Sequence, residues 1–372
     1  MPSPHSRTAV IFAPNTRNLG MYSVDLAGYQ ILRTSANRVD FFAECKPNVR
    51  EFKYGCMTLN RYTSQDQLSD YDTIVYWGDF TTSYSYGRRE YFNMTATTFF
   101  PYSKTLIKMG ATRSRVQRKV VNRWEQLYLP QFKNKRYYSV GQNFQTMTKP
   151  IFDTLCSTKQ DKYRQFRFIL PRDSVSLNNL SLIFDDRSTP PNLHQICDVA
   201  FLMSGLPKTP PKGLQSKTVG VYFRRSKISN VTELLNALSK HANVVLFTDW
   251  IGEGIDFEAA FQKNITRIRE CHFIVSDTYH FLINALREGR PVIGLGNAQS
   301  EQVSTTGDFK KKVLFSDAGL TEYYIELSSH FLSRSEIDET LRLAGALGED
   351  YWKCYRFDRD TVIQQIKEAL AV

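Results

Sequence analysis

The chain has 372 residues, of which 42% are hydrophobic and 23% are charged. This length exceeds what one hydrophobic core usually serves, and this composition excludes extended disorder, so we expect two globular domains. The net charge of +11 favours anionic partners, namely a phosphorylated substrate, an acidic glycan, a membrane surface or nucleic acid.

In chain order, apolar runs typical of buried parallel strands predict strands at 10–13, 39–42 and 72–77. A polar turn at 14–20 follows the first run, and a helical pattern follows the third at about 104–127. Strands alternating with helices indicate one half of a doubly wound α/β fold.

Residues 204–216 contain three prolines and two glycines without apolar periodicity, which is typical of an interdomain linker. A second α/β series follows, with strands predicted at 217–223, 244–248, 272–276 and 291–294 and helices at 231–239, 256–269 and 279–288. We therefore expect two Rossmann-like domains, 1–203 and 217–372, with a mainly helical region from about residue 317. Ligands of open α/β sheets bind beyond the carboxyl ends of the strands, so the loops there should hold the site.

The segment 272–296 carries the strongest local signal for a functional site. A buried strand leads into a polar turn, and His280 falls in the first turn of the following helix, which Gly289 ends. The N–H groups and dipole of a helix start favour an anion. His280 there either contacts a bound phosphate and moves a proton, or simply packs and caps the helix.

Basic residues gather at Arg113, Arg115, Arg118, Lys119 and Arg123, and again at Lys133, Lys135 and Arg136. They form either a solvated helix face or a contact surface for phosphate or acidic polymer. The six cysteines form no Cys-x-x-Cys pair and have no histidine at zinc-ligand spacing, so we expect reduced thiols and no metal. The chain has neither a signal-peptide core nor an apolar run of membrane-spanning length, so we expect a cytoplasmic protein, either free or peripheral to a membrane.

Several motifs in order resemble the polysaccharide pyruvyl transferase family over roughly residues 8–300. The late family block, Ser/Asp-x-Arg-x-His followed by an apolar helix and Gly-x-Pro-Val-Ile, is similar to Ser276, His280, Gly289 and 291–293 here. The weaker matches are Asn18-Leu19-Gly20 to the Asn-x-Gly turn, 72–79 to the Asp-x-Ile-Val-x-Gly-Gly-Gly strand, 198–202 to the Asp-Pro-Val-Phe-Leu segment and 219–225 to the strand that ends in a basic residue.

The resemblance implies two facing Rossmann-like domains of the GT-B type and transfer of a pyruvyl group from phosphoenolpyruvate to sugar hydroxyls, usually giving a cyclic ketal. Two departures bear on the donor. The arginine two places before the family's histidine is Thr278 here, and the glycine triplet is reduced to Gly78 between Trp77 and Asp79. A threonine cannot grip a carboxylate or phosphate as a guanidinium does. Either nearby cations compensate, or the donor differs, or pyruvyl transfer has been lost.

Our mechanistic hypothesis gives His280 and Asp79 the catalytic roles. His280 protonates the donor's methylene carbon or holds the departing phosphate, and Asp79 acts as base towards the sugar hydroxyl. We expect substrate contacts from Arg224, Arg225, Ser276, Thr278, Asn18, Gly20 and Gly78, with no cofactor besides the donor. We also expect His280 and the two arginines to line one cleft that faces the N-terminal domain, with His280 making few core contacts.

Two alternative functions remain open from the sequence. The first is a two-domain glycosyltransferase that uses a nucleotide sugar, which the missing arginine favours. The second is a non-catalytic binder of anionic glycan or nucleic acid, which only the positive charge favours. Nucleic acid is the weaker partner of the two, because the chain contains no nucleic-acid-binding motif.

Overall fold

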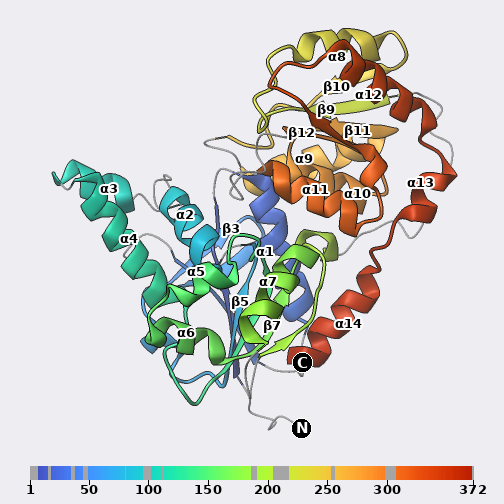
Figure 1. Ribbon diagram of the computed structural model, residues 1–372. Helices are drawn as coiled ribbons and strands as arrows, with labels where there is room; N and C mark the ends of the chain where they lie inside the picture. The colour runs from blue at the N-terminus through green and yellow to red at the C-terminus, as the bar shows by residue number, and fades with distance from the viewer. Residues whose placement is uncertain are drawn as a thin grey trace. The chain divides into compact units, whose positions relative to one another are not determined.

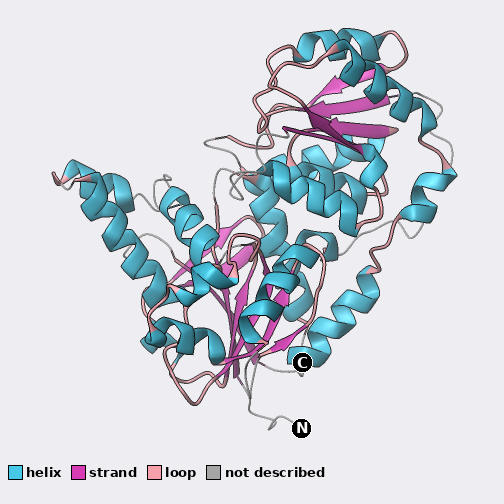
Figure 2. Cartoon of the chain, viewed as in Figure 1, coloured by secondary structure: helices cyan, strands magenta, loops and turns pink. Residues whose placement is uncertain are grey.

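The computed structural model describes residues 7–15, 18–34, 38–44, 49–79, 81–94, 102–110, 112–185, 191–203, 218–252, 256–297 and 307–370. The chain folds into two compact units. The first holds Met1–Met203 and Arg359–Val372, and the second holds Ser204–Asp358. In each unit, helices pack against a sheet (Figures 1 and 2). The predicted linker at 204–216 lies outside the described residues.

The first unit is built on an eight-stranded sheet in the order β3-β4-β2-β1-β5-β6-β7-β8. Its strands are β1 (Arg7–Phe12), β2 (Arg38–Ala43), β3 (Glu51–Tyr54), β4 (Met57–Arg61), β5 (Thr73–Trp77), β6 (Arg136–Gln142), β7 (Phe166–Pro171) and β8 (Asn192–Leu193). The described pairings are parallel except between β3 and β4. Central β1 and β5 are buried almost end to end, because helices cover both faces of a parallel sheet.

The helices of the first unit are α1 (Leu19–Leu32), η1 (Gln65–Leu68), α2 (Tyr84–Met94), α3 (Tyr102–Lys108), α4 (Arg113–Tyr128), α5 (Lys149–Asp153), α6 (Ser157–Arg164), α7 (Ser174–Phe184), η2 (Val199–Leu202) and α14 (Arg359–Leu370). The sequence predicted one long helix at 104–127. The structure instead has α3 and α4, separated by a turn in which Gly110 takes a φ of +80°, a backbone conformation that ends helices.

The second unit has a five-stranded parallel sheet in the order β10-β9-β11-β12-β13. Its strands are β9 (Thr218–Tyr222), β10 (Asn243–Leu246), β11 (Phe273–Ser276), β12 (Val292–Asn297) and β13 (Tyr324–Leu327). Its helices are α8 (Val231–Ser239), α9 (Phe257–Glu270), α10 (Tyr279–Arg287), α11 (Gly307–Asp317), η4 (Thr321–Tyr323), α12 (Arg334–Ala346) and α13 (Glu349–Cys354). The α/β fold with two Rossmann-like units and a helical C-terminal region is therefore confirmed.

The C-terminal helix corrects our domain boundaries, because we expected the second domain to run to residue 372. Helix α14 belongs to the first unit, where the Arg359 guanidinium donates to the Leu202 carbonyl oxygen at 3.2 and 3.3 Å. Ile366 and Leu370, one helical turn apart, are buried. This short apolar stripe is buried in the first unit, and the spacing of its residues along the chain does not predict which unit buries it.

Candidate active site

The strand order of the second unit reverses between β9 and β11. These strands pair in parallel, with Tyr222 opposite Ser276, so the residues that follow them emerge at the same edge of the sheet. Helix connections from such neighbours run in opposite directions, which opens a ligand crevice beyond the carboxyl ends of the strands. Arg224 and Arg225 follow β9, and the turn before α10 follows β11.

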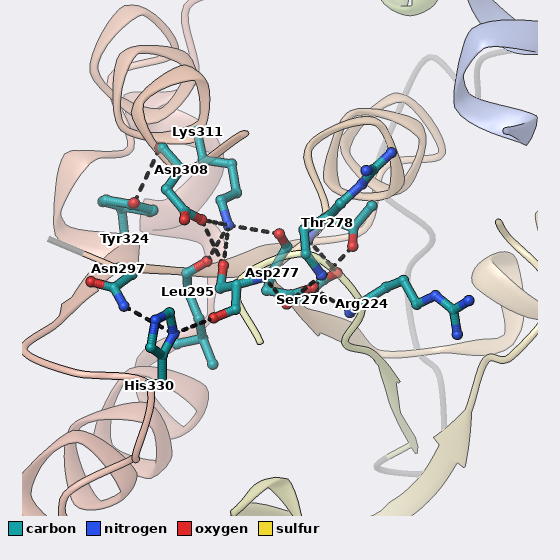
Figure 3. A network of polar contacts seen from close by, with 12 residues as sticks. Arg224, Ser276, Asp277, Thr278, Leu295, Asn297, Asp308, Lys311, Tyr324 and His330 are labelled. Carbon is teal, nitrogen blue, oxygen red and sulfur yellow. Dashed lines mark hydrogen bonds and ion pairs between the residues drawn. The ribbon is translucent and has the colours of Figure 1, made fainter. Parts of the chain in front are cut away.

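A buried carboxylate ties these two loops together. Asp277 accepts the backbone N–H groups of Arg224 at 2.8 Å, Arg225 at 2.8 Å and Ser226 at 2.7 Å (Figure 3). The hydroxyl of Thr278 also donates to Asp277, at 2.9 Å. Hydrogen bonds to an ionised acceptor are stronger than neutral ones, so this carboxylate fixes the arginine loop against the start of α10.

The side chains of Arg224 and Arg225 are exposed, although their backbone N–H groups are bonded to Asp277. Both are exposed, and no carboxylate of the described residues pairs with either guanidinium. In Figure 3 the Arg224 side chain points away from the polar network. Two adjacent guanidinium groups on a fixed loop can bind a carboxylate or phosphate through forked hydrogen bonds.

A buried lysine supports the same edge of the sheet. Lys311 of α11 is fully buried and donates to the Ser226 hydroxyl at 2.9 Å and to the carbonyl oxygens of Asp277 and Leu295, each at 2.6 Å. Its ammonium also pairs with Asp308 at 2.5 Å. Burial lowers the pKa of Lys311, although the carboxylates of Asp308 and Asp277 counteract this effect. Lys311 thus joins the loops that follow β9 and β11 to strand β12.

We predicted substrate contacts for Ser276 and Thr278, but both hydroxyls bond within the protein. Ser276 Oγ donates to the Tyr222 carbonyl oxygen at 2.6 Å and accepts the Thr278 N–H at 3.1 Å. Thr278 Oγ1 donates to Asp277, and both residues are buried. These hydroxyls therefore hold the loop together, and a substrate contact from either residue stays a prediction.

His280 lies in the first turn of α10, as the sequence predicted, but it is more buried than we expected. Only 7% of the residue is exposed, and its imidazole lies edge-on to the Tyr279 ring with centroids 5.0 Å apart. The expectation of few core contacts was therefore wrong. Every residue of α10 is buried, because the helix lies in the interior of the unit. The orientation of His280 towards the first unit stays a prediction.

In the first unit the strand order reverses between β1 and β5, and the predicted residues there mainly shape the backbone. Asn18 caps α1, with its Oδ1 accepting the Gly20 N–H at 2.9 Å. Gly78 has a φ of +110°, and a Cβ there would lie 3.2 Å from Val24 Cγ1. A side chain at Gly78 would be strained, so the turn after β5 requires glycine.

Asp79 is placed differently from our hypothesis. Its carboxylate pairs with the Arg172 guanidinium, which also contacts Asp173 and Asp198 at 3.3 Å. All four residues are at most 4% exposed. A general base must reach the proton that it removes, whereas this carboxylate faces a cation inside the protein. Asp79 therefore lies in an ion-pair cluster that joins the ends of β5 and β7, and its role as a base stays a prediction.

The sequence reasoning missed a buried acid at the first reversal. Asp25 of α1 is 1% exposed, neither carboxylate oxygen has a hydrogen-bond partner among the described residues, and burial raises its pKa well above the ordinary value of 3.8. A Cβ on Gly78 would lie 3.8 Å from Asp25 Oδ1. The available signal was a single acidic residue within the otherwise uncharged run 19–32. Asp277 and Lys311 were missed too, because nothing local distinguishes them from solvent-facing charges.

The described residues include no group of three or more histidine, cysteine or acidic side chains able to hold a metal ion. Nor does any helix among them combine the length and apolar composition needed to cross a bilayer.

Comparison with known proteins gives the class of this protein. The model of the polysaccharide pyruvyl transferase family matches residues 51–300, which is more than half of the chain. The chain therefore belongs to the polysaccharide pyruvyl transferase family, as the motifs predicted, and membership makes it a glycan-modifying transferase. None of the curated proteins compared with the chain matches it.

Solved structures resemble the chain only distantly. The UDP-GlcNAc 2-epimerase from Methanocaldococcus jannaschii has 8% identity and a TM-score of 0.48, with 98% of this chain and 100% of that chain covered. The UDP-GlcNAc 2-epimerase from Neisseria meningitidis, bound to UDP-GlcNAc, has 11% identity and a TM-score of 0.47, with 98% and 99% covered.

Proposed function

We propose that this protein transfers a pyruvyl group from phosphoenolpyruvate to a sugar hydroxyl of a glycan or glycan precursor. One observation carries the proposal beyond the family match. At the strand-order reversal of the second unit, Asp277 fixes the backbone of Arg224 and Arg225 while both guanidinium groups stay exposed. Phosphoenolpyruvate carries about three negative charges near neutral pH, which calls for fixed cations and helix N-termini.

In this proposal the arginine pair supplies the positive charge that the family's arginine would supply at position 278. Arg224 and Arg225 bind the donor's carboxylate and phosphate, and the start of α10 adds its backbone dipole. His280 delivers a proton to the methylene carbon, which leaves an oxocarbenium-like centre for the acceptor hydroxyl to attack. A second hydroxyl of the sugar then replaces the phosphate and closes the ketal. Of the two hydroxyl protons released, one restores His280 and the other leaves with the phosphate.

A thermal-shift screen of the whole protein tests the donor. A ligand that binds only the folded state stabilises it by about 2.7 kcal/mol at a hundredfold excess over Kd, so phosphoenolpyruvate should raise the Tm. The double variant Arg224→Gln, Arg225→Gln should lose that shift without unfolding. The matched control is Arg334→Gln, Arg342→Gln, which removes two exposed arginines from α12 of the same unit. Phosphate release that depends on an added acceptor glycan would then establish turnover.

The second candidate is a glycosyltransferase that uses a nucleotide sugar. Thr278, at the position of the family's arginine, donates its hydroxyl to Asp277 and presents no cation. If nucleotide sugars raise the Tm and phosphoenolpyruvate does not, this candidate replaces the first. Thr278→Arg sharpens the choice, because a gain of phosphoenolpyruvate binding in this variant alone would mean that the natural protein uses another donor.

A further inference from the structure

The turn between α3 and α4 carries exposed apolar side chains. Ile107 is 53% exposed and Met109 is 77% exposed, on either side of Lys108 at the end of α3. Helix α3, at whose end they lie, is at the edge of the first unit, away from its sheet (Figure 1). A single exposed apolar side chain is ordinary, but two at one protruding turn leave an apolar point without cover.

Positive charge surrounds this apolar point. Its exposed cations are Lys108, Arg113, Arg115, Arg118 and Lys119. Among the described residues, none of the five forms an ion pair, and no acidic residue occurs from 102 to 124. Val116, Val120 and Trp124 form a stripe of α4 that is buried against the unit, and Arg115, Arg118 and Lys119 lie on the opposite side of the helix. The basic face is therefore left to solvent while the helix itself is firmly anchored.

Charge and apolar exposure together favour one kind of partner. An acidic polymer such as nucleic acid would pair with the cations, but its phosphates offer no place for Ile107 and Met109. The headgroup region of an anionic bilayer offers both, because it attracts basic side chains and lets neighbouring apolar side chains enter the acyl boundary. Each cation near such a surface contributes about fivefold to affinity.

We propose that residues 107–110 and 112–119, the α3–α4 tip, dock this protein reversibly on an anionic lipid surface. Ile107 and Met109 insert at the boundary between headgroups and acyl chains. The five cations lie among the anionic headgroups. This docking goes beyond the proposed reaction and does not depend on the identity of its donor.

Vesicle sedimentation of the full chain tests the proposal. The protein should sediment with vesicles that contain phosphatidylglycerol, remain in solution with phosphatidylcholine alone, and dissociate as salt is raised. The triple variant Arg113→Gln, Arg115→Gln, Arg118→Gln should bind about a hundredfold more weakly, because three cations at about fivefold each are lost. Its matched control removes three exposed lysines from the second unit, by Lys240→Gln, Lys263→Gln and Lys353→Gln, and should bind as the natural protein does.

The apolar contribution is tested separately with Ile107→Ser, Met109→Ser. This variant keeps every charge and should still lose at least about tenfold in vesicle binding, because both side chains leave water only at a membrane. All of the variants change exposed side chains, so circular dichroism should show unaltered melting. Three results would overturn the proposal: no binding to anionic vesicles at low salt, equal loss in the lysine control, or full binding by the Ile107, Met109 variant. The last would point to an acidic polymer instead.

Discussion

The two strand-order reversals use charge in opposite ways. In the second unit the buried carboxylate of Asp277 accepts hydrogen bonds from backbone N–H groups, and the Arg224 and Arg225 side chains stay exposed. In the first unit a buried guanidinium, Arg172, is held among three carboxylates. The comparison teaches that a charged residue after a buried strand has no fixed meaning. What the side chain meets decides whether it binds a ligand or holds the loops.

Removing Arg172 at the first unit's strand-order reversal should lower the stability of the protein. Arg172→Met leaves Asp79, Asp173 and Asp198 buried together without a counterion, and breaking a buried ion pair from one side costs about 3–5 kcal/mol. Urea denaturation measures this loss. Arg167→Met, an exposed arginine of β7, is the control and should change the unfolding free energy little. Near-normal stability of Arg172→Met would mean that the ion-pair cluster contributes little to the free energy of unfolding.

Asp79→Asn is the companion variant, because it separates the two assignments of this residue. If the residue serves the ion-pair cluster, the enzyme that remains folded keeps its turnover within a few-fold. A loss of about 10²- to 10⁴-fold at unchanged stability would restore Asp79 as a base.

Changing His280 at the second unit's strand-order reversal should instead lower activity. His280→Gln keeps a polar side chain of similar size, and we expect it to lower the rate of transfer by about 10²- to 10⁴-fold, as loss of a positioned acid does. His280→Ala should also cost stability, because the residue is buried and truncation leaves a cavity. Comparing kcat with the melting temperature for the two variants separates the effects. Full activity of folded His280→Gln would show that the chemistry lies elsewhere.

Asp277→Asn probes the clamp between the two loops. An amide has one acceptor oxygen and no charge, so the three backbone N–H groups that now bond to Asp277 lose their ionised partner. We expect a cost of about 2–3 kcal/mol in unfolding free energy and a raised KM for the donor, because hydrogen bonds to charged groups are worth more than neutral ones. Thr278→Val, which removes one donor, should cost less. A change in kcat without a change in KM would contradict a role in positioning the arginines.

The last effect, that of Asp25, appears only as a dependence of stability on pH. Burial raises its pKa in the folded state, so this carboxyl keeps its proton where the unfolded chain releases it. Its contribution to stability is complete below pH 3.8 and is lost as the pH rises towards the raised value. Asp25→Asn cannot titrate, so its stability should fall less between pH 4 and 7, by about 1.4 kcal/mol per unit of pKa difference removed. Parallel pH profiles of the two proteins would show that Asp25 has a partner that keeps it ionised.

Much of the fold could be predicted because it follows from local patterns. Buried parallel strands need apolar residues on both faces, so the runs around Val10, Ile74 and Ile274 were recognisable from composition alone. The turn into α10 and the position of His280 in its first turn followed in the same way. The ordered motifs were enough to indicate the family, because motif order survives where overall identity is low.

The roles of the site residues could not be predicted, because they depend on partners distant in sequence. Asp79 meets Arg172 from 93 residues away, and Asp277 meets the backbone of Arg224 from 53 residues away. Nothing near either aspartate shows that one faces a guanidinium and the other backbone N–H groups. The C-terminal helix likewise belongs to the first unit through contacts such as that of Arg359 with Leu202, 157 residues earlier. The sequence by itself determined which segments become strands and helices and which family the chain belongs to. Only the tertiary structure decided which charges are buried and which stay exposed, because burial and pairing arise when distant loops meet at one edge of a sheet.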